Sequence, residues 1–462
     1  MKKTILIVIS KDIIRRNIID TDFWPVLKKA NPDARFVLAV CAGQEEQYRV
    51  GFEQKNIVVV GYAKEPHRGW RRILFFLVRT GIHSRSNIFH RWHAYKRGRV
   101  GFFSTIGKSL LSNTLARFSW YKDMIRWLLL HTRGSRAIER ILDEYHPNLV
   151  FTPSLIDNDV DALIALEAKR RGIRVVGMVR SWDNLNHHGL LAVVPDRFVF
   201  QNQWLKEAAG AFQAIDVEKM RTDVIGLPHY DLYKNPAPYL RGRGQFLQGL
   251  GLESDKKLIF LAGTEYSYLE MLLPRRLEEM INSGAIRTPV QVLFRPHPSP
   301  KVDSAEYGME SMRHVKIDRA YMERGKRLST DTGGFIQLMW YADVVINICS
   351  TLSIDAAVFD TPAIALEFDD PERPQRYWKS MPRFNEYFDH QRRLIETGGV
   401  RTPRSLEDLA RDIDAYLDNP SLDAEGRKKV LEEFVAPFDG KAGERLASIL
   451  TGELAELPLR VQ

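Results

Sequence analysis

Two residues that could hold a phosphate follow an apolar run in the second half of the chain. The run at 292–294 ends in Arg295, Pro296, His297 and Pro298. The prolines fix φ and remove amide donors, so a strand cannot continue through them. A guanidinium offers a planar fork of donors to phosphate or carboxylate, and an imidazole donates one or two hydrogen bonds. Arg295 and His297 are therefore predicted to bind an anion at a strand end. A turn with a structural histidine is the simpler alternative.

The start of a later helix is a second candidate for the same anion. The apolar run at 343–349 is followed by Ser350 and Thr351, and the helix that they open carries Asp355. Serine and threonine are good N-caps, and the free amides of a helix start bind anions. Plain capping explains the pair as well, but its place after a strand favours a binding role.

A third and weaker signal is the end of the run at 257–263, where Gly263 is followed by Thr264. A glycine at a strand end lets a ligand approach the backbone closely. The three predicted strand ends would then line a crevice that holds the phosphates of a nucleotide-linked substrate.

The segment "MVRSWDNLNHHG" at 178–189 supplies candidates for proton transfer. It follows a strand-like run, so its polar side chains are predicted to reach a ligand. Asp183, His187 and His188 are candidate bases that could take the proton of an acceptor hydroxyl. For Asp183, an Asx-turn or a helix cap is an equal alternative. Trp182 and Asn184 are expected to contact the acceptor.

Asp157 is a second candidate base because it directly follows the strand-like run at 148–154. With Asp159 and Asp161 it forms an alternating run that looks like a metal-binding D-x-D pattern. The run lacks the glycine turn of a calcium loop, and an aspartate here suits the cap of the next helix. We therefore expect no metal site.

Basic and polar residues also follow the first apolar run, at 5–10. They are Lys11, Arg15 and Asn17, which could receive an anionic acceptor. A solvated basic helix face is an equal alternative.

The elements that must position these residues are short apolar runs alternating with helical segments. Such runs are typical of parallel strands covered on both faces. They lie at 5–10, 35–40, 56–61, 148–154, 174–180 and 197–202, and again at 257–263, 290–297, 314–318, 343–349 and 363–368. Two such series in 462 residues predict two doubly wound domains that face a central cleft. In these sheets ligands bind outside the carboxyl ends of the strands.

The predicted domains are 1–228 on the acceptor side and 229–430 on the donor side. Helices at 431–462 are expected to pack back across both domains. The polar segment at 234–245, rich in proline and glycine, is the candidate linker.

A basic stretch interrupts the first series. Residues 68–136 hold fifteen Lys or Arg and one acid, a net charge of +14 in a chain whose total is +9, and four of the nine tryptophans. A helical insert at about 62–145 that lies on an anionic membrane surface is predicted. Packing of the tryptophans on the first domain is the alternative. The apolar start ends at Ile9 and is interpreted as a strand and not as a signal peptide, and no apolar stretch approaches the roughly 20 residues of a membrane helix.

The motif "RPHP" at 295–298 followed by "STLSID" at 350–355 resembles bacterial polysialyltransferases, capsular Kdo transferases and CDP-glycerol glycerophosphotransferases. The segment "VIGLPHYD" at 224–231 looks like an interdomain turn shared with UDP-N-acetylglucosamine 2-epimerases, whose Gly-Gly pair is absent here. "FDGKAGER" at 438–445 resembles a late segment of the CDP-glycerol group, and "SWDNL" at 181–185 resembles surface-polysaccharide transferases. The resemblance implies a GT-B glycosyltransferase in which Arg295, His297, Ser350 and Thr351 hold the donor phosphate and nucleotide.

The expected function is therefore an inverting, metal-independent transferase of lipopolysaccharide or capsule synthesis, without a cofactor. It would move a sugar, or a glycerophosphate unit, from a CMP-, CDP- or UDP-linked donor to a glycan or lipid-linked acceptor. The expected location is the inner face of the cytoplasmic membrane, and the two cysteines in strand-like runs suit a reducing compartment. A sugar-nucleotide 2-epimerase and a non-catalytic binder of membrane or RNA are the alternatives. No recognised RNA module accompanies the basic stretch, so nucleic acid is not an expected partner.

Overall fold

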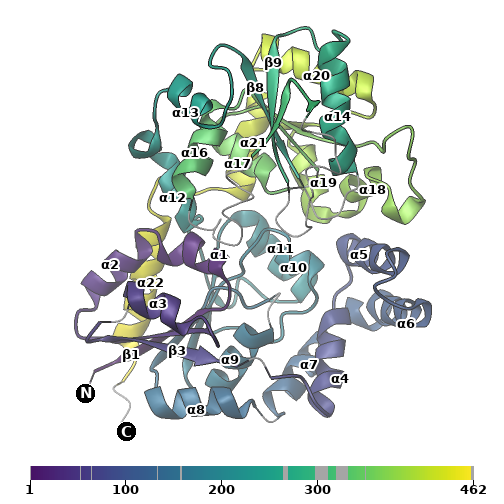
Figure 1. Ribbon diagram of the computed structural model, residues 1–462. Coiled ribbons are helices and arrows are strands. Elements are labelled where there is room, and N and C mark those ends of the chain that lie inside the picture. The colour runs from purple at the N-terminus through teal and green to yellow at the C-terminus, as the bar shows by residue number, and fades with distance from the viewer. Residues whose placement is uncertain are drawn as a thin grey trace. The chain divides into compact units, whose positions relative to one another are not determined.

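The computed structural model describes residues 2–52, 54–63, 65–132, 134–156, 159–263, 269–296, 311–318, 331–348 and 350–458 (Figure 1). The chain forms two compact units. One consists of Met1–Lys234 and Ala436–Gln462, and the other of Asn235–Val435. The sequence analysis set the boundaries at residues 228 and 430, whereas the units of the structure meet at 234/235 and 435/436.

The first unit is built on a seven-stranded parallel sheet with the order β3-β2-β1-β4-β5-β6-β7. Its strands are β1 (Thr4–Ile9), β2 (Arg35–Cys41), β3 (Ile57–Tyr62), β4 (Leu149–Thr152), β5 (Arg174–Gly177), β6 (Arg197–Phe200) and β7 (Arg221–Val224). The strand order reverses direction between β1 and β4, as in a doubly wound fold. The six apolar runs of the first half are thus confirmed as parallel strands, and β7 is the seventh strand of the same sheet.

Alternation along β1 sends side chains into two separate cores. Leu6 and Val8 pack in one core with α9 (Asp159–Arg170) and the insert, and Ile5 and Ile7 pack in the other. The remaining helices of this unit are α1 (Asp12–Ile14), a π-helical turn at Arg15–Ile19, α2 (Phe23–Ala30), α3 (Glu45–Phe52), α10 (Asn184–His187), α11 (Gln203–Gln213), α12 (Pro228–Lys234) and α22 (Ala442–Glu456). Both faces of the sheet are therefore covered.

The basic stretch folds into helices between β3 and β4, which confirms a helical insert in the first unit. Its elements are α4 (Trp70–Thr80), α5 (Arg85–Lys96), α6 (Phe102–Asn113), a 3-10 turn at Leu115–Arg117, α7 (Ser119–Leu130) and α8 (Arg136–Tyr145). Leu74, Phe75 and Val78 of α4 and Tyr121, Ile125 and Leu129 of α7 join the first core. The insert is thus part of the unit and not an appendage.

The second unit has a six-stranded parallel sheet with the order β10-β9-β8-β11-β12-β13. Its strands are β8 (Lys257–Ala262), β9 (Val290–Arg295), β10 (Val315–Ile317), β11 (Val344–Asn347), β12 (Ala363–Ala365) and β13 (Val400–Arg401). Its helices are α13 (Arg243–Gly249), α14 (Leu269–Asn282), α16 (Thr332–Tyr341), α17 (Leu352–Val358), α18 (Pro382–Tyr387), α19 (Asp389–Glu396), α20 (Leu406–Asp418) and α21 (Ala424–Phe434), with 3-10 turns at Ala237–Tyr239 and Tyr377–Lys379. The two-residue strand β13 is the one strand of this sheet that the apolar runs do not predict.

Two motifs of the sequence meet in the first unit. Asp231 accepts hydrogen bonds from the backbone amides of Ala442, at 3.1 Å, and Gly443, at 2.8 Å. A Cβ atom on Gly226, which has φ of +88°, would lie 2.5 Å from the carbonyl oxygen of Pro437. The turn at 224–231 and the segment at 438–445 therefore form one packed joint that holds the start of α22.

Candidate functional site

Candidate donor residues of the second unit follow three adjacent strands. Gly263 follows β8, Arg295 ends β9, and Ser350 lies three residues beyond β11, in a sheet where β9, β8 and β11 are neighbours. The amide of Gly263 donates to the carbonyl oxygen of Arg295 at 2.9 Å. Since all three strands are parallel, these residues lie at the carboxyl edge of one sheet. The predicted residues Thr264 and His297 lie outside the described residues.

Arg295 is held along this edge by a buried carboxylate. Its Nε and Nη2 atoms lie 2.9 Å and 2.6 Å from Oδ2 of Asp318, which is only 2% exposed. Its guanidinium carbon lies 5.5 Å from the centre of the Phe260 ring. Asp318 follows β10 and was not among the predicted site residues, although the rule of polar residues after apolar runs also applies to it.

The start of α17 divides its tasks between two hydroxyl residues. Ser350 Oγ accepts from the amide of Leu352 at 3.3 Å, so Ser350 performs the local capping. Thr351 occupies the N-cap position, is exposed, and makes no capping hydrogen bond with its side chain. Asp355 is buried in the body of this short helix. The arrangement leaves the Thr351 hydroxyl at the sheet edge, where the sequence places a donor contact.

In the first unit, two predicted acceptor residues are buried and shape the loop after β5. Asn184 is fully buried, and its Oδ1 accepts from the amides of Arg180 and Ser181, both at 3.0 Å. Trp182 is also buried, and its carbonyl oxygen accepts from Nε1 of Trp204 at 2.8 Å. Direct contact of these two side chains with an acceptor stays a prediction.

The candidate bases of this loop point to different partners. Nε2 of His188 lies 3.3 Å from Oδ2 of Asp183, so these two form an acid–imidazole pair. Nε2 of the buried His187 lies 2.9 Å from Nδ1 of His90 on α5. Asp183 is the N-cap residue of α10 but makes no capping bond with its side chain, so capping does not account for it.

The residues after β1 have local contacts. Arg15 pairs with Asp20 at 3.2 Å, and its guanidinium lies near the rings of Tyr48 and Phe52. Asn17 is buried and accepts from Nε of Arg16 at 2.8 Å. Lys11 is the N-cap residue of α1. Binding of an acceptor by Lys11, Arg15 and Asn17 stays a prediction.

The alternating aspartates do not act as one set. Oδ2 of Asp159 lies 2.8 Å from Nε2 of His67 and 3.1 Å from Nη2 of Arg79. Burial would raise the pKa of Asp159, but His67 and Arg79 outweigh burial and lower it. Asp161 is wholly buried, and burial raises its pKa to about 7. Asp157 lies outside the described residues.

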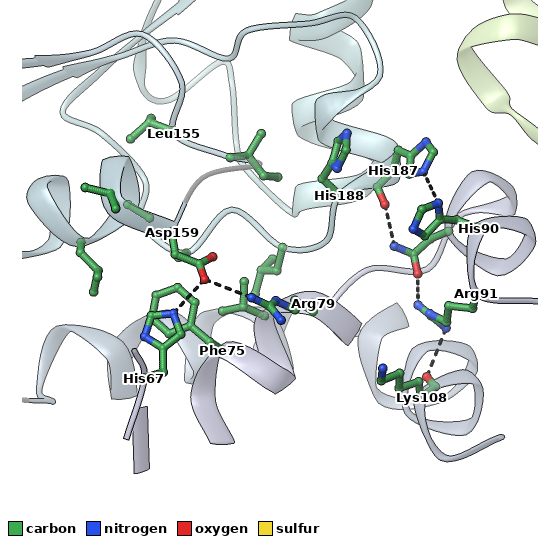
Figure 2. A pocket seen from close by; sticks show the side chains of 18 of the residues that line it. His67, Phe75, Arg79, His90, Arg91, Lys108, Leu155, Asp159, His187 and His188 are labelled. Atoms are coloured by element: carbon green, nitrogen blue, oxygen red, sulfur yellow. Dashed lines mark hydrogen bonds and ion pairs between the residues drawn. The ribbon is translucent and has the colours of Figure 1, made fainter. Parts of the chain in front are cut away.

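A cavity of about 590 Å³ lies in the first unit between the insert and α9 and α10 (Figure 2). Its lining includes His67, His90, His187 and His188, which come from three separate parts of the chain. The sequence reasoning missed the cavity because its walls approach one another only through tertiary packing. It therefore found His187 and His188 but not His90 on α5, the partner of His187.

Helix α5 of the insert holds the segment at 178–189, which carries the candidate bases, through hydrogen bonds. Asn87 Nδ2 donates to the carbonyl oxygen of His187 at 2.9 Å, and Asn186 Nδ2 donates to Ser86 Oγ at 3.2 Å. Ser84 Oγ donates to the carbonyl oxygen of Asn186. The buried polar face of α5 thus positions the "NLNHH" segment, and no local sequence signal marks this role.

Two insert helices expose apolar side chains and bury some polar ones, although α7 also buries Tyr121, Ile125 and Leu129. On α6, Thr105, Ser109 and Ser112 are buried while Phe103 and Leu110 are exposed. On α7, Lys122 and Arg126 are buried while Trp120, Met124 and Trp127 are exposed. No helix among the described residues is both long and apolar enough to cross a membrane. The exposed apolar residues of α4, α6 and α7 are called the apolar face below; they are Trp70, Ile73, Phe76, Phe102, Phe103, Ile106, Leu110, Trp120, Met124 and Trp127.

No protein-family model and no curated protein matches this sequence. Solved structures do match over nearly the whole chain. S. aureus MnaA with UDP is 12% identical, with a TM-score of 0.55 and 100% of both chains covered. The UDP-GlcNAc 2-epimerase from Neisseria meningitidis bound to UDP-GlcNAc is 12% identical, with a TM-score of 0.53, covering 97% of this chain and 100% of that one. A glycosyltransferase from Rickettsia africae is 12% identical, with a TM-score of 0.50, covering 98% and 99%.

At these identities the likeness extends to the fold alone. It confirms two doubly wound α/β units of the GT-B type. The Neisseria epimerase and the Rickettsia glycosyltransferase share this architecture. The finer resemblance to the polysialyltransferase, Kdo transferase and CDP-glycerol group stays a prediction.

Proposed function

We propose that the protein transfers a sugar, or a sugar-like unit, from a nucleotide-activated donor to an acceptor hydroxyl, with inversion at the transferred carbon. The observation that carries this proposal is the placement of Gly263, Arg295 and Ser350–Thr351 after three adjacent parallel strands. A glycine, a guanidinium and a helix start together suit a phosphate group. The solved neighbours that were determined with UDP or UDP-GlcNAc show that this fold accommodates such nucleotides.

In the proposed reaction, the acceptor oxygen attacks the donor carbon and the bond from that carbon to the phosphate oxygen breaks. The nucleotide leaves with the bonding electron pair, and Arg295 with the start of α17 stabilises its negative charge. A base takes the acceptor proton. We assign that task to the Asp183–His188 pair, because the carboxylate can hold the imidazole and stabilise its protonated form.

An epimerase is the second candidate, since epimerases share the fold. An epimerase acts on its nucleotide sugar alone and needs no acceptor. The cavity of about 590 Å³ in the first unit, lined by the insert, provides space for a second ligand and therefore favours a transferase. A purely non-catalytic membrane or RNA binder would leave the grouping of Gly263, Arg295 and Ser350 at one sheet edge of the second unit unexplained.

We further propose that the insert lies on an anionic membrane surface. The apolar face combines exposed aromatic residues with nearby cations, such as the exposed Arg72. Exposed aromatic and aliphatic side chains beside arginines suit the interface of a bilayer, where the apolar parts enter the lipid and the charges meet anionic head groups. A membrane-bound acceptor of surface-polysaccharide synthesis would give this face its purpose.

The donor site is tested by replacing Ser350 and Thr351 together with alanine. We expect at least a roughly tenfold loss of affinity for the donor nucleotide, because hydrogen bonds to a charged phosphate contribute about 1.5–3 kcal/mol each. Isothermal titration with UDP, CDP and CMP measures affinity, and thermal unfolding measures stability. Ser405→Ala is the matched control, since Ser405 caps α20 through a 3.0 Å bond from the Asp408 amide.

The control should lose about 0.5–2 kcal/mol of stability and no nucleotide affinity. If the Ser350/Thr351 variant behaves like the control, the start of α17 is only a cap and the donor site is elsewhere. Arg295 requires a paired design, because Arg295→Ala alone would leave Asp318 buried without its partner. Arg295→Gln with Asp318→Asn removes both charges and keeps the test on nucleotide binding.

A further inference from the structure

We infer that the cavity beside the insert binds the phosphate head of a lipid-linked acceptor. This inference rests on the proposed transferase function, because an acceptor is needed only in a transfer reaction. It adds the chemical class of the acceptor and the side chains that recognise it. The cavity, its cations and the apolar face are three separate observations that agree on such a ligand.

One end of the cavity carries two cations that have no acidic partner among the described residues. Arg91 is buried, and its guanidinium donates to Asn87 Oδ1 and, at 3.2 Å, to the carbonyl oxygen of Lys108, both neutral acceptors. Among the described residues, no carboxylate pairs with Arg91 or Lys108. Contacts run from His90 to His187, from His187 through Asn87 to Arg91, and from Arg91 to Lys108. Figure 2 labels His90, His187, Arg91 and Lys108 along this chain.

Both cations at this end have lowered pKa values, and no acidic partner among the described residues offsets the effect. Burial lowers the pKa of Arg91 to about 10. Burial, together with the positive charges of Arg79 and Arg91, lowers the pKa of Lys108. A bound phosphate would reverse both effects, because an anion favours the protonated forms. Guanidinium and ammonium groups are both common phosphate ligands in proteins.

Asp159 lies apart from these cations, and among the described residues neither Asp159 nor Glu65 forms an ion pair with them. Asp159 is engaged by His67 and Arg79. Glu65, which is exposed, lies two residues from His67 in the chain. Figure 2 shows the His67–Asp159–Arg79 cluster apart from Arg91 and Lys108. The cavity thus has one neutralised end and one end that is open to an anion.

Much of the remaining lining is apolar, which a free phosphate ion would not require. The apolar lining includes Phe75 and Val78 of α4 together with Leu155, Val160 and Leu163. Desolvating such a surface favours a ligand with a hydrocarbon or sugar part attached to its phosphate. The lining therefore suits an amphiphilic ligand and not an inorganic ion.

Helices α4 and α6 connect the cavity with the apolar face. Phe75 and Val78 of α4 line the cavity while Phe76 is on the apolar face, and Lys108 of α6 lines the cavity while Leu110 is on the apolar face. The Lys108 ammonium nitrogen lies 6.0 Å from the Phe76 ring centre, so it stands where the two surfaces meet. A lipid held by the apolar face could place its phosphate in the cavity without leaving the bilayer.

The test uses dihexanoyl phosphatidic acid, kept below its micelle concentration, as a probe for the full-length protein. Isothermal titration should show saturable binding. Dihexanoyl phosphatidylcholine and inorganic phosphate should each bind roughly tenfold or more weakly, since each lacks either the exposed phosphate monoester or the apolar part. Lys108→Gln and Ala94→Trp should each reduce phosphatidic acid affinity by roughly tenfold or more, the first through charge and the second by filling the cavity.

Lys96→Gln is the matched control, because Lys96 is an exposed lysine of α5 that does not line the cavity. It should bind the probe like the parent. Lys108 is half-buried and its side chain makes no hydrogen bond among the described residues, so Lys108→Gln is expected to fold, which thermal unfolding verifies. UDP, CDP or CMP affinity should be unchanged in all three variants, which separates this site from the donor site.

Equal binding of phosphatidic acid by Lys108→Gln and the parent would overturn the inference, as would equal binding of the phosphatidylcholine probe. Equal affinity for inorganic phosphate would show a site for a free anion and would also overturn it. Any of these results would leave the donor site intact, provided that nucleotide still binds. The Ser350/Thr351 variant tests nucleotide binding at the donor site, so its result does not depend on any of these lipid measurements.

Discussion

Asp161 is a carboxyl group that the fold keeps away from water. It lies in the first turn of α9 and is wholly buried. Among the described residues, its carboxylate oxygens have no hydrogen-bond partner at normal distance and angle. Burial raises its pKa to about 7, against smaller opposing effects of Ser10, Lys11 and Arg180. In the unfolded chain the same group should titrate near its ordinary value of about 3.9.

The free energy of unfolding should therefore fall as the pH rises from about 4 to about 7. In this range the unfolded chain has released the Asp161 proton while the folded protein still holds it. Asp161→Asn lacks this titration. Its stability relative to the parent should increase by roughly 2–4 kcal/mol between pH 4 and pH 8. Urea unfolding of both proteins at the two pH values measures the change, and a pH-independent difference would contradict it.

At the scale of single elements, α6 and α7 both expose a second set of apolar side chains, although α7 also buries Tyr121, Ile125 and Leu129 in the core. A helix on a water-exposed surface buries its apolar stripe and exposes its polar stripe. Here Arg126 of α7 is buried and donates to the carbonyl oxygens of Leu191, at 3.1 Å, and Gln213, at 2.7 Å. The tryptophans of the same helix remain exposed. Such a pattern is favourable when the exposed stripe meets lipid.

We expect a triple variant, Phe103→Ser, Leu110→Ser and Trp127→Ser, to lose at least roughly tenfold in binding to vesicles of phosphatidylglycerol and phosphatidylcholine. Its thermal stability should be nearly unchanged because all three side chains are exposed. Sedimentation with the vesicles measures binding. Val50→Ser is the control, since Val50 is 85% exposed on α3, outside the insert.

The charged part of the same face is tested by Arg72→Glu, Arg97→Glu and Arg99→Glu together. Arg71 is left unchanged because it donates to the carbonyl oxygen of Gly134. Binding of this variant to the anionic vesicles should fall. Salt at about 1 M should likewise weaken vesicle binding by the parent protein, because it shortens the range of charge interactions to roughly 3 Å. A parent protein that stays in the supernatant at low salt would refute the membrane proposal.

At the scale of the whole molecule, the chain returns to its first unit after completing the second. Leu446, Leu450 and Leu454 of α22 are buried in the core that β1 shares with α2. A Cβ atom on Gly443 would lie 2.8 Å from the amide nitrogen of Phe23, so only glycine permits this approach of α22 to α2. Glu453, also fully buried, lies 3.2 Å and 3.1 Å from the guanidinium groups of Arg197 and Arg221. The first unit is therefore complete only with the last helix.

Leu450→Ala should destabilise the first unit by about 2–5 kcal/mol, because it removes a fully buried side chain and leaves a cavity. Hydrogen exchange should quicken at the amides of β1 and β4 and remain unchanged at those of β8 and β11. Ser448→Ala, at an exposed position of α22, is the control. Equal acceleration in both units would show that they unfold as one body.

Much of the fold could be predicted from the sequence because each buried parallel strand is a short, continuous apolar run. Such a run can be recognised without any alternation of polar and apolar residues. Eleven apolar runs correspond to strands β1 to β6 and β8 to β12, and the rule for parallel sheets places polar residues at their carboxyl ends. That rule located Gly263, Arg295 and Ser350. It could not find β13, whose two residues carry no pattern.

The sequence by itself determined the two doubly wound units, the helical insert and the strand ends that carry candidate chemistry, since each depends on local composition and periodicity. Only the tertiary structure decided which partners these residues have. It paired Arg295 with Asp318 and His188 with Asp183, and it formed the cavity from α4, α5, α6 and α9. It also separated the described cations of residues 68–136 into buried ones, such as Arg91 and Arg126, half-buried ones, such as Lys108, and exposed ones, such as Arg72. Charge and spacing along a chain do not specify burial or long-range contact, because both arise when distant segments pack against one another.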